Sequence, residues 1–333
     1  MRNKALAAVL GVGVSVFFLW WALKGLSFAE VWHHASSANI GLILISVVMA
    51  TTTFVMRVFR WRLILHASDG GPVAKLPMWH AVAIGFMANN VFPFRAGEVL
   101  RAVAINRLAP VHFSSALSSL VLERLFDGLT IIGLLFLGLV TAGIPATTRI
   151  GEVVVADVAA KMAILCALLL AACLATLLFP EYAKRAIRAL IPSPTLAGKL
   201  ADFVDGVRRG VQALASPSRI AAVAAWSVGM WLFNALSFWV GYRAFGIEVG
   251  YGGALLQQSV LVLGIAAPSS PGYVGVFEGV IKAVLALFGV PADMAVAFAL
   301  TYHVTTFLPI TLLGFLSLLR TGLSLRPTRP ATP

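Results

Sequence analysis

Six apolar runs, each about as long as a helix that crosses a lipid bilayer, divide this chain. They cover residues 1–23, 39–65, 114–140, 156–179, 219–245 and 293–319. Hydrophobic residues make up 60% of the 333 residues, charged residues only 11%, and the mean hydropathy is +0.93. Soluble domains are far less apolar and carry about 25% charged residues. The sequence therefore predicts an all-α polytopic membrane protein in which residues 1–333 form a single integral membrane domain.

The N-terminal run has a competing interpretation as a cleaved signal peptide, because it begins with Arg2 and Lys4 and continues as an apolar stretch. The run is long for a signal peptide, and it ends in the aromatic pair Trp20-Trp21. No clear small-x-small cleavage site follows it. We therefore expect an uncleaved first span.

A further apolar run, residues 76–92, is too short to cross a membrane cleanly and ends at Pro93. If it did cross, the arginines of the segment that follows would lie on the outer side, against the charge bias of the chain. A re-entrant hairpin resolves both problems, because the short helix 97–108 then returns the arginines to the side where the run began. We predict such a hairpin here.

A second short run, residues 250–267, has the same layout, since it ends in a proline-rich turn and is followed by an apolar segment at 274–289. With six full spans, this hairpin enters from the side opposite to the first. The units 39–140 and 219–320 then have inverted topology, a design typical of transporters. Irregular backbone at membrane depth is tolerated only where it is buried or lines a cavity.

The basic residues follow the ends of the apolar runs. The net charge is +12, with 25 Lys and Arg residues. In this topology only Lys24, Arg149, Lys161 and Arg243 fall on the outer side. This bias predicts a multi-pass protein of the cytoplasmic membrane with both termini in the cytoplasm. Residues 181–218 are expected to be a cytoplasmic linker with amphipathic helices on the membrane surface.

Three arginines, Arg57, Arg60 and Arg62, surround Trp61 near the end of the second span. One interpretation is that the arginines extend to the cytoplasmic surface, with Trp61 at the membrane interface. The other is that they contact a lipid phosphate, which matches the guanidinium donors.

The hairpins and the third span carry ionisable residues at membrane depth. Arg95, Glu98 and Arg101 lie in the first hairpin, Glu123, Arg124 and Asp127 in the third span, and Glu278 in the second hairpin. Such residues are costly in a membrane and usually face the bundle interior or a wet cavity. Helix N-termini and arginines favour anions, so a lipid phosphate is a reasonable ligand. A structural ion-pair network is the alternative.

Enzyme and cofactor signatures are absent from the sequence. There is no His-Glu-x-x-His, no nucleophile elbow, no P-loop and no Cys/His cluster with metal-ligand spacing. We therefore expect no enzyme, no cofactor and no metal. The positive charge is explained by membrane topology, so no nucleic-acid partner is predicted.

Four motifs in this order resemble one family, the lysylphosphatidylglycerol synthase transmembrane-region proteins, also called flippase-like-domain proteins. They are Arg-x-x-Arg-Trp-Arg at 57–62, Asn-Asn-x-x-Pro-x-Arg-Ala-Gly-Glu-x-x-Arg at 89–101, Glu-Arg-x-x-Asp at 123–127 and Pro-Gly-x-x-Gly-x-x-Glu at 271–278, with Pro271, Gly272, Gly275 and Glu278. The resemblance covers nearly the whole chain and implies lipid translocation. The aminoacyl-transferase domain of bifunctional members does not follow here, so lysyl-lipid synthesis is not expected.

Our prediction is thus a lipid flippase or transporter for an anionic or phosphate-bearing lipid. The alternatives are a non-transporting partner of a lipid or cell-envelope glycan synthesis enzyme, and an intramembrane enzyme that uses a glutamate as acid or base. The predicted substrate-binding residues are Arg57, Arg60, Asn89, Asn90, Arg95, Glu98, Arg101, Glu123, Arg124, Asp127, Ser270, Gly272 and Glu278.

Overall fold

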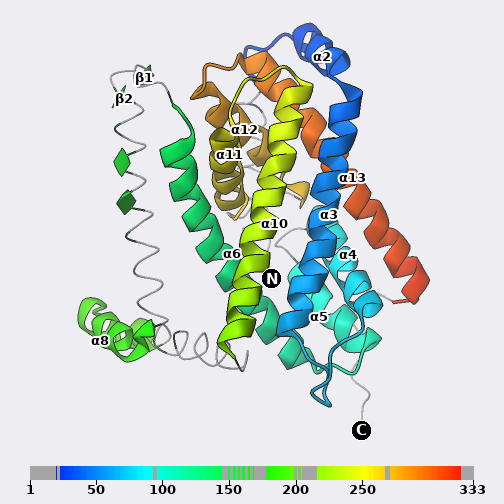
Figure 1. Cartoon of the computed structure of the whole chain (residues 1–333), viewed down its shortest axis with the longest axis vertical. Coiled ribbons are helices and arrows are strands. Elements are labelled where there is room, and N and C mark those ends of the chain that lie inside the picture. Colours follow the sequence, from blue (N-terminus) through cyan, green and yellow to red (C-terminus); the bar gives the residue numbers. More distant parts are fainter. Residues whose placement is uncertain are drawn as a thin grey trace, which may run out of the picture.

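The computed structural model describes residues 23–92, 96–144, 178–198, 216–266 and 271–323, together with residues 20, 149–150, 153–154, 157, 160–161, 164–165, 168, 201 and 204. Most of the first and fourth predicted spans, residues 1–23 and 156–179, and much of the predicted linker therefore lie outside the described residues. The described part is a bundle of helices (Figure 1).

The helices of the described part are α2 (Phe28–Ser37), α3 (Ile40–Ile64), α4 (Lys75–Val91), α5 (Gly97–Leu108), α6 (Phe113–Thr141), α8 (Pro180–Leu190), α10 (Pro217–Ala244), α11 (Tyr251–Gly264), the 3-10 turn η1 (Pro271–Tyr273), α12 (Val276–Ala286) and α13 (Ala292–Thr321). Two two-residue strands, β1 (Arg149–Ile150) and β2 (Val153–Val154), pair antiparallel.

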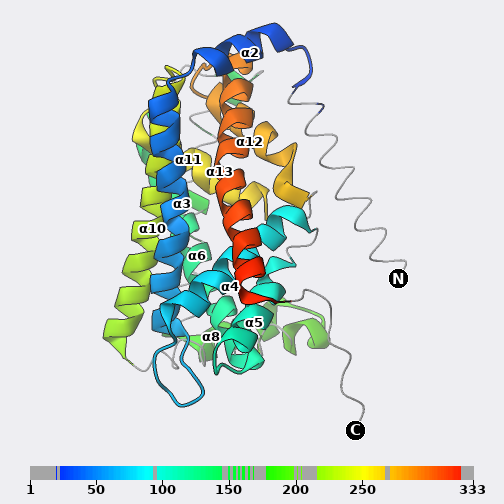
Figure 2. The ribbon, with the colours of Figure 1, turned by 90° about the vertical axis from the view of Figure 1, so that its right-hand side faces the viewer.

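Three helices of the described part, α3, α10 and α13, are long and apolar enough to cross a membrane. They run side by side along the long axis of the bundle (Figures 1 and 2). The 29-residue α6 also runs along this axis and carries the buried charges described below. Asn39 caps the start of α3 through a 3.1 Å bond from the Leu42 amide, and Ser216 similarly caps α10.

The outer surface of these helices is apolar. On α13, exposed side chains recur every three or four residues and form a stripe of Val304, Leu308, Leu312, Phe315 and Leu319. The same holds for Ile40, Leu44 and Val48 on α3. A soluble monomer rarely exposes so continuous an apolar surface, whereas lipid chains would cover it.

The helices α4 and α5, called the first helix pair here, pack against each other through glycines. A Cβ atom on Gly97 would lie 1.9 Å from the carbonyl oxygen of Gly85, so only glycine allows this approach of the two backbones. The amide of Gly97 donates to Asn89 Oδ1 at 2.9 Å and so joins the end of α4 to the start of α5.

The helices α11 and α12, with η1 between them, form the second helix pair. Two glycines in the turn, Gly272 and Gly275, have φ values of +69° and +88°. Tyr273 between them has a φ of +60°, which a residue with a side chain rarely adopts. The returning helix α12 is shorter than the predicted segment 274–289 because this left-handed turn delays its start until Val276.

The chain enters and leaves the first helix pair at one end of the bundle, and it enters and leaves the second helix pair at the opposite end (Figure 1). At one end, Ser68 donates its amide proton to the carbonyl of Pro110, joining the loop before α4 to the loop after α5. At the other end, the Asn39 amide donates to the Ala244 carbonyl just before α11 begins. α2 lies at this second end, where His34 contacts Asp293 at the start of α13.

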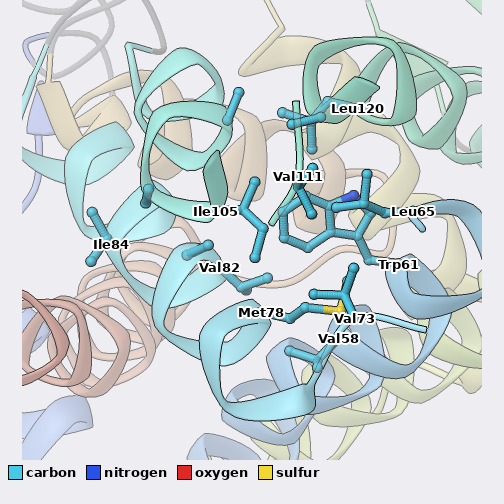
Figure 3. Packing of buried hydrophobic residues seen from close by; sticks show 14 of the residues in the cluster. Val58, Trp61, Leu65, Val73, Met78, Val82, Ile84, Ile105, Val111 and Leu120 are labelled. Atoms are coloured by element: carbon cyan, nitrogen blue, oxygen red, sulfur yellow. The ribbon is translucent and has the colours of Figure 1, made fainter. Parts of the chain in front are cut away.

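The largest apolar cluster fills the space between α3, α4, α5 and the start of α6 (Figure 3). Trp61 is fully buried at its centre, with Met78 and Ile105 around it. The indole nitrogen of Trp61 donates to Ser119 Oγ at 2.8 Å. Trp61 is therefore a core residue of the bundle, because its ring packs inward and its indole nitrogen has a partner within the bundle.

Candidate functional site

Helical spacing brings four of the predicted charges onto facing surfaces. Arg57 and Arg60 lie three residues apart on α3, and Glu123 and Asp127 lie four apart on α6, so each pair shares one face of its helix. All four residues are buried. A charge in the interior needs an opposite charge or hydrogen bonds, which the two helices supply to each other.

Arg60 lies at the centre of this charge cluster. Its guanidinium forms a hydrogen-bonded ion pair with Asp127, donates to Ser227 Oγ of α10 at 2.9 Å, and lies 3.5 Å from Glu123. The side chain has no exposed surface. Arg60 therefore does not extend to the cytoplasmic surface but joins α3, α6 and α10.

Arg101 of the first helix pair completes the inner part of the cluster. It donates to Glu123 at 2.6 Å, and its guanidinium stacks 3.8 Å from the centre of the Trp61 ring. The cation thus has one ionic and one aromatic partner. Arg101 and Glu123 are almost fully buried, so this pair fixes α5 against α6.

Arg124 and Glu98 form the more accessible part of the cluster. They lie 3.3 Å apart, with side-chain exposures of 40% and 29%. Arg124 also lies 3.6 Å from Asp127. This pair therefore connects the buried charges to the open space beside them.

Arg57 is the least satisfied charge. It is 7% exposed and lies 3.6 Å from Asp127, which is beyond hydrogen-bond distance. Its guanidinium lies 5.1 Å from the ring centres of both Phe86 and Trp231. Its Nε and Nη1 atoms have no hydrogen-bond partner within the described part of the chain. Asp127 is shared instead with Arg60 and with the Trp231 indole, which donates to it at 2.9 Å.

A cavity of about 370 Å³ lies beside the cluster. Its polar lining includes Arg57, Arg124, Glu98, Asp127, Asn89 and Asn90 from the α3, α4, α5 and α6 side and Asn234 and Gln258 from α10 and α11. Aromatic residues of both helix pairs and of α10 and α13, among them Phe86, Trp231, Phe277 and Phe307, share the remaining lining with aliphatic residues such as Ile131, Leu261 and Ile310. The cavity is therefore an apolar chamber, rich in aromatic rings, with charge at one wall.

The two asparagines hold the wall of the cavity in place. Asn89 accepts the Gly97 amide, and Asn90 donates to Thr311 Oγ1 of α13 at 2.7 Å. Both side chains are half-buried. Each uses part of its hydrogen-bonding capacity for the fold and borders the cavity with the rest.

Of the remaining predicted residues, Gly272 and Glu278 are described, and both lie apart from the charge cluster. Glu278 belongs to the second helix pair, where it contacts His303 at 2.5 Å, and the Gly272 carbonyl contacts the same imidazole. Arg95 and Ser270 lie outside the described residues. The structure thus places Arg57, Arg60, Arg101, Glu123, Glu98, Arg124 and Asp127 in one network, with Asn89 and Asn90 beside it.

Sequence reasoning did not select His303, Phe86 or Trp231. A histidine inside an apolar helix is a signal that could have identified His303, because ionisable groups at membrane depth are costly. The two aromatic residues carry no such signal, since they resemble any core residue. Within the described residues, no group of three or more His, Cys, Asp or Glu side chains could hold a metal ion.

Apolar helices of membrane-crossing length, an apolar outer surface, and buried charge beside an aromatic cavity define a helical integral membrane protein with a polar interior site. The chain belongs to the family described as the lysylphosphatidylglycerol synthase TM region, whose model matches residues 8–314. The resemblance of the four motifs is therefore confirmed.

Its relatives include two UPF0104 membrane proteins of Methanothermobacter thermautotrophicus. One is 24% identical in an alignment of 286 positions that covers 82% of this chain and 81% of the relative. The other is 22% identical in an alignment of 340 positions that covers 96% of this chain and 94% of the relative. Glycosyltransferase AglD of Haloferax volcanii is 31% identical over 125 residues, 38% of this chain, and the match spans 20% of its length.

Proposed function

We propose that this protein moves an anionic, phosphate-bearing lipid across the cytoplasmic membrane. Arg57 is the observation that carries this proposal. It is a buried cation at the cavity wall, and its Nε and Nη1 donors have no hydrogen-bond partner among the described residues, although Nη1 lies 3.6 Å from the Asp127 carboxylate. Unpaired buried donors on a charged group are costly, and phosphate oxygens are the acceptors that best match a guanidinium.

The charge of the cluster supports an anionic ligand. Among the described residues, its four arginines, Arg57, Arg60, Arg101 and Arg124, face three carboxylates, Glu98, Glu123 and Asp127, which leaves one positive charge in excess. A single phosphodiester carries one negative charge and would balance it. The aromatic lining suits the rest of a headgroup or the first part of the lipid chains.

In the proposed arrangement the chain crosses the membrane six times, and the two helix pairs are re-entrant hairpins that meet near the midplane. The units 39–140 and 219–320 form an inverted repeat, and both termini lie in the cytoplasm. Transporters with broken helices place their substrate site at such a meeting point. The opposite openings of the two helix pairs support this arrangement.

The test compares Arg57→Gln with the wild-type protein in proteoliposomes that contain labelled phosphatidylglycerol or, as a phosphate-free probe, labelled ceramide. Loss of a charge-assisted contact worth about 1.5–3 kcal/mol should slow phosphatidylglycerol translocation by about tenfold or more. Native mass spectrometry should show a matching loss of bound phosphatidylglycerol. Ceramide should be moved slowly, if at all, by both proteins.

Arg62→Gln is the matched control, because Arg62 is on the same helix, donates to the Val73 carbonyl at 3.1 Å and does not line the cavity. It should keep the wild-type rate. Equal rates for the wild-type protein, Arg57→Gln and protein-free liposomes, with no bound phospholipid, would contradict the proposal. That outcome would favour the alternative of a membrane partner for a lipid or cell-envelope glycan synthesis enzyme.

A further inference from the structure

His303 joins α13 to the turn of the second helix pair through both of its ring nitrogens. Nδ1 lies 2.5 Å from Glu278 Oε1, and Nε2 lies 2.9 Å from the Gly272 carbonyl oxygen. The side chains of His303 and Glu278 are 8% and 2% exposed. Two titratable groups are thus in direct contact in the interior of an apolar bundle.

The flanking groups fix the protons on both side chains. The Gly272 carbonyl can only accept, so Nε2 of His303 must carry a proton and donate it. The Gly275 amide donates to Glu278 Oε2 at 2.7 Å, so that oxygen is an acceptor. The remaining contact, between Nδ1 and Oε1, is a hydrogen bond only if one more proton lies between these two atoms.

The proton between the two side chains can reside on Nδ1 of His303 or on Oε1 of Glu278. The pair is then an imidazolium with a carboxylate, or a neutral imidazole with a carboxylic acid, and its net charge is zero in both forms. Loss of the proton leaves a lone pair on Nδ1 facing a carboxylate oxygen in a site with little water. That arrangement is repulsive and leaves a buried negative charge without its partner.

We propose that His303 and Glu278 form a proton-binding site whose occupancy holds the turn 271–275 on α13. Release of the proton detaches the turn. If the protein transports lipid as proposed above, the ion coupled to lipid movement is therefore H⁺. This assignment of the coupling ion rests on the proposed function.

The backbone of the turn supports such a switch. Tyr273 is held at a φ of +60° between two glycines that are also left-handed. A non-glycine residue keeps this conformation only when its surroundings enforce it. The bond from His303 to the carbonyl of the preceding residue, Gly272, is one such restraint. Its loss allows the turn to relax.

The proton site adjoins the cavity. The His303 ring stacks 4.1 Å from the centre of the Phe277 ring and lies 4.3 Å from that of Phe307, and both rings line the cavity. On the other side of the turn, a Cβ atom on Gly272 would lie 3.4 Å from the carbonyl oxygen of Asn90. Movement of the turn therefore changes the cavity wall and its contact with α4.

Other titratable or charged groups on the neighbouring elements are Lys282 on α12, Tyr273 on η1, Tyr302, Asp293 and Arg320 on α13, Tyr251 on α11, His80 and Lys75 on α4, Glu30, His33 and His34 on α2, Arg57, Arg60 and Arg62 on α3, and Tyr242, Arg219 and Arg243 on α10. Several have roles elsewhere. Tyr302 bonds to Ser237, Asp293 to His34, and Arg57 and Arg60 belong to the charge cluster. Lys282, one turn after Glu278, is the remaining charge of α12.

Two substitutions separate a proton switch from a merely structural contact. In Glu278→Gln, the amide oxygen can accept the Gly275 amide and the NH₂ group can donate to Nδ1, so the closed state forms without a titratable proton. In His303→Phe, the ring can still stack between Phe277 and Phe307 but makes neither hydrogen bond. The first should lock the turn closed and the second should release it.

The measurement is hydrogen–deuterium exchange of residues 271–286 in the purified full chain, from about pH 5 to about pH 9, corrected for intrinsic exchange. In the wild type, exchange should increase by up to about tenfold per pH unit once the proton is lost. It should stay slow at every pH in Glu278→Gln and fast at every pH in His303→Phe. A pH-independent wild type, or faster exchange in both variants, would overturn the proposal.

Proteoliposomes with an imposed pH gradient supply the second arm, with internal pyranine to follow protons and labelled phosphatidylglycerol to follow lipid. Lipid movement that depends on the gradient and disappears in Glu278→Gln supports H⁺ coupling. A pH-dependent turn without lipid movement keeps the proton site but contradicts the transport proposal. Lipid movement that is insensitive to the gradient, with a pH-independent turn, contradicts the proton site alone.

Discussion

Asp127 connects more charges than any other single side chain in the described part of the cluster. It pairs with Arg60, accepts from Trp231 and lies 3.6 Å from both Arg57 and Arg124. Asp127→Asn preserves the shape but removes the negative charge, so the arginines are left buried and under-compensated. We expect it to lower the free energy of unfolding by about 3–5 kcal/mol, as measured by denaturation in mixed micelles.

Glu181→Gln is the control for that measurement. The Glu181 side chain is 62% exposed on α8 and lies 2.9 Å from Lys184, so the same chemical change is made on a solvent-exposed carboxylate. Its effect should stay within about 1 kcal/mol. Equal effects of the two substitutions would mean that the cluster contributes little to folding.

At the residue scale, the sequence predicts which side chains share a face but not their partners. The four-residue spacing of Glu123 and Asp127 places both on the side of α6 that meets Arg60, as expected. Arg60 binds both carboxylates because α3 packs against α6, and a local sequence pattern does not show which helices pack together. The same holds for Trp61, whose neighbours suggest an interface residue although Ser119 of α6 binds its indole.

At the scale of elements, the first helix pair depends on the absence of two side chains. In Gly97→Ala the new methyl group would lie 1.9 Å from the Gly85 carbonyl oxygen and 2.5 Å from Asn89 Oδ1. Backbone cannot yield as a flexible side chain does, so α5 must move away from α4. We expect a loss of about 1–3 kcal/mol in stability and faster hydrogen exchange in residues 97–108.

Gly229→Ala provides the comparison, because a Cβ atom there would meet nothing within 4 Å in the middle of α10. Alanine favours a helix over glycine by about 1 kcal/mol, so this variant should be as stable as the wild type or more stable. Destabilisation by Gly229→Ala equal to that by Gly97→Ala would contradict the packing argument.

The positions of the helices were predictable because apolar length and capping residues are local properties. The predicted run 39–65 corresponds to α3 with Asn39 as its cap, and 219–245 to α10 after Ser216. The turn at η1 was less predictable. Proline and glycine indicate a break there, but the left-handed conformation of Tyr273 depends on contacts with α13, including the bond between His303 and Gly272.

At the scale of the whole molecule, the cavity lies where the inner ends of the two helix pairs meet within the bundle. Asn89 and Asn90 come from the end of α4, and Ile265 and Tyr273 from the turn after α11. A through-going helix at either place would fill the space with side chains. The ends of two short elements are thus brought together beside the charges that the long helices α3 and α6 carry.

The inverted arrangement predicts that the loops leading into the two helix pairs face opposite sides of the membrane. Asp69 precedes α4 and Glu248 precedes α11, and both are exposed acidic residues. The test uses two variants, Asp69→Cys and Glu248→Cys, each made in a protein whose Cys166 and Cys173 are changed to alanine. In intact spheroplasts, a membrane-impermeant maleimide should label Glu248→Cys, whereas Asp69→Cys should react only after permeabilisation. Val304→Cys, on the apolar stripe of α13, should react only after denaturation, because lipid covers it.

Labelling of both loop cysteines from the same side would contradict the inverted topology. If Asp69→Cys were labelled from outside and Glu248→Cys only after permeabilisation, the inverted topology would stand and only the cytoplasmic placement of the termini would be wrong. The relative position of the two loops follows from the packing of the bundle, whereas the orientation of the bundle in the membrane is inferred from the distribution of lysine and arginine.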